Sequence, residues 1–94
     1  MATVMTMHWP EVTEAQYEQA RREVDWEGNV PQGAKFHVAW FAGDGFRVLD
    51  IWESQADCER FLSGRLTPAV KRIGIAGQPK VEFAPAHAIF APSV

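Results

Sequence analysis

The sequence predicts one α+β domain in which helices cover one face of a four-stranded antiparallel sheet. Three observations lead to this fold class. The 94 residues suffice for a single domain with a single core, spanning residues 1–94. Strand-like and helix-like segments follow one another along the chain in the order β-α-β-β-α-β. Helix caps and a glycine-rich turn mark the boundaries between these segments.

The first half of the chain is expected to form a strand, a helix and a loop. Residues 2–9 are rich in β-branched and large apolar side chains, which is typical of a strand. Thr13 and Gln16 have the spacing of a capping box, so a helix should begin there. We expect this helix to end near Asp25, because glycines and a proline make residues 26–35 a loop.

A hairpin is expected in the middle of the chain. Residues 36–42 and 46–52 are almost continuously apolar or aromatic, which favours two strands. The segment 43–45, Gly-Asp-Gly, predicts the turn that joins them. Ser54 follows as the cap of a second helix.

A proline should interrupt that second helix. Because Pro68 lacks an N–H, Thr67 is expected to act as a fresh cap for a short helix over residues 68–73. The last strand is predicted over residues 80–90, where Pro85 indicates a bulge or an edge position.

This order is the ferredoxin-like βαββαβ arrangement, and its strands suggest a homodimer. A sheet covered on one face should alternate apolar and polar side chains, but these strands are apolar on both faces. We expect Met5, Phe41, Leu49 and Ile51 to lie on the uncovered face, where pairing with a second copy would bury them. The alternative is a monomer with an apolar binding face.

Composition excludes several classes of partner. The net charge is −3 and no run of Lys or Arg is present, which disfavours nucleic acid. The one cysteine, Cys58, excludes an internal disulfide and cysteine-based zinc sites. No apolar run is long enough for a membrane span, and no signal peptide is recognisable, so a cytoplasmic location is expected.

The segment Phe46–Ser54 resembles the dimeric α+β barrel superfamily, which includes antibiotic biosynthesis monooxygenase-like proteins. In that pattern an acidic residue, a skipped position and a tryptophan end the third strand, and a helix cap follows. Asp50, Trp52 and Ser54 match it here. Phe61 stands where these proteins often carry a histidine that faces the pocket. The resemblance implies a pocket between sheet and helices, in a superfamily that holds oxygenases, decarboxylases, cyclases and heme enzymes.

Three histidines are candidate general bases, because the pKa of imidazole lies near neutrality. His8 ends the first strand near the expected ligand entrance, His37 lies on the second strand, and His87 lies on the fourth. Each could instead be a structural or surface histidine. Their spacing matches no metal motif, so neither a metal nor another cofactor is expected.

Asp50 is the most informative charged residue, because it lies in mid-strand between apolar neighbours. A buried carboxylate must be paired, hydrogen-bonded or protonated. It could orient His8 or hold a substrate hydroxyl. Alternatively, it could form a structural ion pair with a helix arginine such as Arg21 or Arg60.

Aromatic side chains could line a pocket for a planar ligand. The candidates are Tyr17, Trp26, Trp40 and Trp52, with Phe61 added by the resemblance. Trp26 is the best candidate for a lid, because it follows the first helix. The alternative is that these aromatic residues are ordinary core residues. Cys58, on the apolar side of the second helix, is interpreted as a small buried hydrophobe.

Three functions remain open from the sequence. The first is a cofactor-free monooxygenase or cyclase acting on a hydrophobic, aromatic or polyketide-like compound, with His8 or His37 as base. The second is a binding module that holds such a ligand without turnover. The third is a purely structural dimer.

Overall fold

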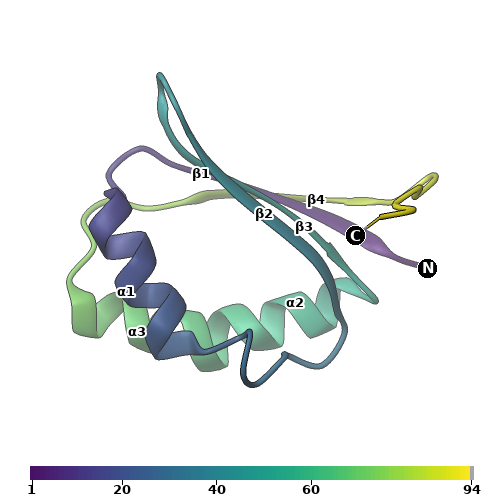
Figure 1. Cartoon of the computed structure of the whole chain (residues 1–94), viewed down its shortest axis with the longest axis horizontal. Helices are drawn as coiled ribbons and strands as arrows, with labels where there is room; N and C mark the ends of the chain where they lie inside the picture. The colour runs from purple at the N-terminus through teal and green to yellow at the C-terminus, as the bar shows by residue number, and fades with distance from the viewer. Residues whose placement is uncertain (94) are drawn as a thin grey trace.

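The structure is a computed structural model that describes residues 1–93, and it confirms the ferredoxin-like α+β fold (Figure 1). The elements are β1 (Thr3–Trp9), α1 (Glu14–Val24), β2 (Ala34–Ala42), β3 (Gly45–Trp52), α2 (Gln55–Phe61), the π-helical turn η1 (Leu62–Leu66), α3 (Thr67–Ile73) and β4 (Lys80–Pro85). The strands form one antiparallel sheet in the order β2-β3-β1-β4. All the helices lie on one side of this sheet (Figure 1).

The start and the end of α1 follow the predicted cap. The Thr13 hydroxyl accepts the backbone N–H of Gln16 at 3.1 Å, and the Gln16 side chain accepts the backbone N–H of Thr13 at 3.0 Å. Asp25 ends the helix in the left-handed conformation, with φ of 51°. The chain then turns into the loop that leads to β2.

The second helical segment differs from the prediction at Thr67. Thr67 has helical backbone angles and caps nothing, because the chain runs from α2 through η1 directly into α3. Both the N–H and the hydroxyl of Thr67 donate to the Leu62 carbonyl, the hydroxyl at 2.8 Å. The wider π turn accommodates Pro68, whose ring would clash with a carbonyl in a regular α-helix.

The last strand is shorter than predicted. β4 ends at Pro85 rather than at residue 90, and it lies at the edge of the sheet. Proline offers no N–H to a ladder, and Ala86 makes one further backbone bond, to the Ala2 carbonyl at 2.9 Å. Residues 86–93 continue without forming a strand.

The hairpin register decides which side chains face the helices. A two-residue connection at Gly43–Asp44 pairs Phe41 with Phe46 and His37 with Asp50. Two of the expected assignments to the uncovered face are therefore wrong. Met5 is only 1% exposed in the core, and Phe41 lies on the helix side opposite Phe46.

The remaining apolar strand residues lie on the side away from the helices, here called the open face. Cross-strand pairing groups Val38 with Leu49 and places Phe36, Ile51 and Val4 beside one another. Val38 and Trp40 are 40% and 42% exposed on this face. Leu49 and Ile51 are partly exposed, as expected from the sequence.

The core lies between the sheet and the helices. Its buried members include Met5, Met7, Trp9, Val48, Trp52, Cys58 and Phe61. Within residues 1–93, no helix is both long and apolar enough to cross a membrane.

Candidate functional site

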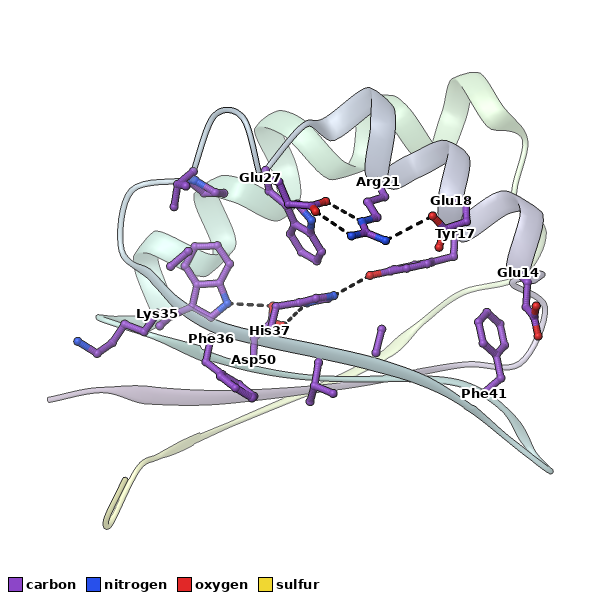
Figure 2. A pocket seen from close by; sticks show the side chains of 17 residues that line it. Glu14, Tyr17, Glu18, Arg21, Glu27, Lys35, Phe36, His37, Phe41 and Asp50 are labelled. Carbon is purple, nitrogen blue, oxygen red and sulfur yellow. Dashed lines mark hydrogen bonds and ion pairs between the residues drawn. The ribbon is translucent and has the colours of Figure 1, made fainter. Parts of the chain in front are cut away.

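A cavity of about 790 Å³ lies between α1, the loop that follows it and the β2–β3 hairpin (Figure 2). Its walls include Tyr17 from α1, Trp26 from the loop, and His37, Asp50 and Trp52 from the sheet. This volume falls in the range of small-molecule sites, and the wall is mostly apolar with a few convergent polar groups.

A buried carboxylate anchors the polar groups. Asp50 is 4% exposed, and both of its oxygens accept hydrogen bonds (Figure 2). Oδ1 lies 2.6 Å from Nδ1 of His37, and Oδ2 accepts Nε1–H of Trp52 at 3.1 Å. His37 and Asp50 are direct cross-strand partners, so the rigid hairpin positions this pair.

The second nitrogen of His37 contacts the only tyrosine of the chain. The Tyr17 hydroxyl lies 2.9 Å from Nε2 of His37. Because the Asp50 carboxylate can only accept, a neutral His37 donates through Nδ1–H, and its Nε2 then accepts the Tyr17 hydroxyl proton. Trp52, Asp50, His37 and Tyr17 thus form one hydrogen-bonded chain along the cavity wall, here called the relay (Figure 2).

Aromatic rings hold the relay in place. The ring of Trp26 meets the His37 imidazole edge-on, with centroids 3.6 Å apart. The Tyr17 ring packs against Phe46 at 5.1 Å. The His37 side chain nevertheless keeps 22% of its surface exposed, so the relay is partly accessible from the cavity.

Charged side chains form the outer rim. Arg21 binds Glu27 with two hydrogen bonds of 2.6 and 2.7 Å and approaches Glu18 at 3.5 Å. This contact ties α1 to the loop that carries Trp26. The Arg21 hydrogen bond lowers the pKa of Glu27, and Glu27 raises the pKa of Arg21.

Burial sets the protonation of two further groups. Burial raises the pKa of Tyr17 above its ordinary value, and the positive charge of Arg21 opposes this shift. Burial also raises the pKa of Cys58 to about 12, with the nearby Asp50 charge adding to the effect. Cys58 is fully buried and behaves as the small hydrophobe expected from the sequence.

The structure brings together only some of the predicted site residues. His37 and Asp50 meet with Tyr17, Trp26 and Trp52 at the cavity. His8 does not, because it pairs with Arg47 on the open face and contacts the Asp44 carbonyl at 2.8 Å.

Several other candidate residues have contacts or positions that differ from those expected from the sequence. Asp50 pairs with neither arginine, because Arg21 binds Glu27 and Arg60 binds Asp57 at 2.8 Å. Trp40 lies on the open face and Phe61 is buried against Trp52, while His87 is exposed after β4. Within residues 1–93, no cluster of three or more His, Cys, Asp or Glu side chains could hold a metal ion.

Sequence reasoning missed the rim of Arg21, Glu18 and Glu27 and the bond between Tyr17 and His37. One signal was available, since Tyr17 and Arg21 are four residues apart and share a helix face. The expected capping box had already fixed the helix on which both lie.

Comparisons with known proteins support the fold. No family model matches the sequence, and no curated protein matches it significantly. Among solved structures, the cofactor-independent oxygenase SnoaB from Streptomyces nogalater is 12% identical, with 94% of each chain covered and a TM-score of 0.66. An antibiotic biosynthesis monooxygenase is 16% identical, with 94% of this chain and 100% of that chain covered and a TM-score of 0.63.

A third structure, a dimeric ferredoxin-like protein of unknown function from Thermobifida fusca, is 13% identical. The match covers 92% of this chain and 92% of that chain, with a TM-score of 0.65. At identities this low, the similarity supports a shared fold and does not establish a shared function. The chain has the ferredoxin-like fold of antibiotic biosynthesis monooxygenase-like proteins, and the resemblance in its sequence is confirmed at that level.

Proposed function

We propose that this protein binds a hydrophobic, planar small molecule in the cavity and oxygenates it without a cofactor, after removing a proton from it. The observation that carries this proposal is the relay at the cavity wall. A histidine oriented by a buried carboxylate is the usual construction of a general base, and aromatic rings beside it suit a planar ligand. The fold shared with a cofactor-independent oxygenase is consistent with it.

The chemistry balances with dioxygen as the only co-reactant. Removal of a proton from a methylene that is conjugated with a carbonyl leaves a carbanion, which supplies electrons to dioxygen. One oxygen atom becomes the new carbonyl, and the other leaves as water with the two methylene hydrogens. The protein has to bind the substrate, accept a proton and return it to the departing oxygen.

Anthrone is a suitable probe, because it is planar, uncharged and carries an acidic methylene between two aromatic rings. Under nitrogen, anthrone should raise the Tm of the wild type, since a ligand that binds only the folded state stabilises it. Under air, the wild type should accelerate conversion to anthraquinone, while His37→Gln should still bind but convert at least about 100-fold more slowly. A wild type that neither binds anthrone nor accelerates its oxidation contradicts the proposal.

The alternative function is a binding module that holds the same ligand without turnover. The observation that favours it is that protein groups already occupy both ring nitrogens of His37. A wild type that binds anthrone under nitrogen but leaves its rate of oxidation unchanged under air would select this alternative.

We further propose that the protein is a homodimer formed through the open face. Val4, Phe36, Leu49 and Ile51 form a contiguous apolar area there, which monomers rarely expose to water. The basic side chains of this face, Arg47 and Lys80, lie with His8 at one end of it. A two-fold axis through the apolar area would pair it with the same area of a second copy.

Sedimentation velocity tests this assembly. The wild type should sediment as a dimer at micromolar concentration, and Leu49→Glu should sediment as a folded monomer because a buried unpaired charge opposes association. Gln19→Glu adds the same charge on exposed α1 and should leave the dimer intact. A monomeric wild type, or a dimeric Leu49→Glu variant, contradicts the interface.

A further inference from the structure

The Tyr17 hydroxyl occupies the nitrogen through which His37 would have to act as the base of the reaction. Both nitrogens of His37 are engaged, Nδ1 by Asp50 at 2.6 Å and Nε2 by the Tyr17 hydroxyl at 2.9 Å. A substrate in the cavity therefore meets no free nitrogen. The Tyr17 oxygen donates its one proton to His37 and makes no other hydrogen bond within residues 1–93, so its lone pairs remain available.

We propose that the Tyr17 hydroxyl is the catalytic residue that takes the substrate proton while its own proton passes to His37. This inference rests on the proposed oxygenase function and extends it to the residue that touches the substrate. His37 and Asp50 then act behind Tyr17 as the groups that make the hydroxyl basic.

The step conserves atoms and charge. The substrate C–H bond breaks and an O–H bond forms on Tyr17, while the former Tyr17 O–H bond breaks and an N–H bond forms at Nε2 of His37. The products are a substrate carbanion and an imidazolium, and nothing is oxidised or reduced. The buried Asp50 carboxylate faces the new imidazolium and stabilises it.

The alternative route through a free tyrosinate is disfavoured. Burial raises the pKa of Tyr17 above its ordinary value of about 10, so the phenol keeps its proton at neutral pH. The hydroxyl can accept a second proton only when it releases the first one at the same time. His37 is the group placed to receive that proton.

Tyr17→Phe removes the hydroxyl and keeps the ring that packs against Phe46. Arg22→Ala is the matched control, because Arg22 is an exposed residue of the same helix with no ion pair within residues 1–93. The measurements are anthrone oxidation under air, the Tm shift with anthrone under nitrogen, and the wild-type rate in mixtures of H₂O and D₂O.

We expect Tyr17→Phe to bind anthrone within about 3-fold of the wild type and to oxidise it at least about 100-fold more slowly, a loss typical of a missing acid–base group. Arg22→Ala should match the wild type. The wild-type rate should fall linearly as the D₂O fraction rises, because of the two protons that move in this step only the Tyr17 hydroxyl proton exchanges with solvent. A purely structural role of Tyr17 would leave the rate independent of the D₂O fraction.

Two results would overturn the inference while leaving the proposed function in place. The first is a Tyr17→Phe variant that oxidises anthrone within about 3-fold of the wild type while His37→Gln does not, since His37 then acts directly. The second is a wild-type rate that does not depend on the D₂O fraction, since no exchangeable proton then moves in the step. A wild type that does not oxidise anthrone removes both the proposed function and this inference.

Discussion

Replacing Asp50 tests how much its two buried hydrogen bonds contribute to the stability of the fold. Its carboxylate accepts Nδ1–H of His37 and Nε1–H of Trp52 in a buried environment. A hydrogen bond to a charged group contributes about 1.5–3 kcal/mol, and Asp50→Ala leaves both donors without an acceptor. We therefore expect Asp50→Ala to lower the free energy of unfolding by about 3–5 kcal/mol, as for other broken buried pairs.

Asp50→Asn should be much milder, because the amide keeps the shape and both contacts. Its oxygen can accept from Trp52, and its NH₂ can donate to Nδ1 of His37, which forces the imidazole proton onto Nε2. The loss of charge assistance should cost about 1–2 kcal/mol. With Nε2 protonated, His37 can no longer accept the Tyr17 proton, so anthrone oxidation should fall at least about 100-fold.

Urea unfolding followed by tryptophan fluorescence measures these changes at one fixed protein concentration, with an unchanged m-value as the check for two-state behaviour. Asp44→Asn is the control, because Asp44 is an exposed carboxylate that pairs with Arg47 at the hairpin tip. It should change the midpoint only slightly. A loss below about 1 kcal/mol for Asp50→Ala, or equal losses for the two Asp50 variants, would refute this reasoning.

Three further predictions follow from the same structure. Because burial raises the pKa of Cys58 to about 12, a thiol reagent at pH 8 should react with it only as fast as the protein unfolds; rapid reaction without urea contradicts this. Because the pKa of Tyr17 is raised in the folded protein, the unfolded chain loses this proton at a lower pH than the folded protein does. The free energy of unfolding should therefore fall as the pH rises above about 10. Tyrosinate absorbance monitors this group alone, and a midpoint below 10 contradicts the shift. Gly45→Ala should destabilise the protein by about 1–3 kcal/mol in urea unfolding, because φ is +117° and the new Cβ would lie 2.5 Å from Pro10 Cα; Gly43→Ala meets open space and should cost clearly less.

The order of elements could be predicted because its signals are local. The capping box at Thr13, the cap at Ser54 and the glycine-rich turn each depend on neighbouring residues, and all three are present in the structure. The limits of local signals appear at Thr67. Pro68 predicted a break, but tertiary packing kept the helical path continuous through a wider turn.

The site could be predicted only in part, because its geometry depends on register. A three-residue turn at 43–45 leaves the pairing open, and a shift of one residue moves every side chain to the other face. The observed two-residue connection places His37 opposite Asp50 and assigns Phe41 to the helix side. The contact between Tyr17 and His37 requires, in addition, that α1 docks on the sheet, which no local pattern specifies.

The π turn at Leu62–Leu66 has a consequence for how this chain could change length. A π turn holds one more residue than the α-helical turn it replaces, so deleting Gly64 should let the helix close into a regular spiral without moving its two ends far. Such a deletion would restore the carbonyl clash at Pro68, so a compatible shortening needs a second change at that position. Evolution or design can therefore add or remove a residue inside this helix only when the proline is exchanged together with it.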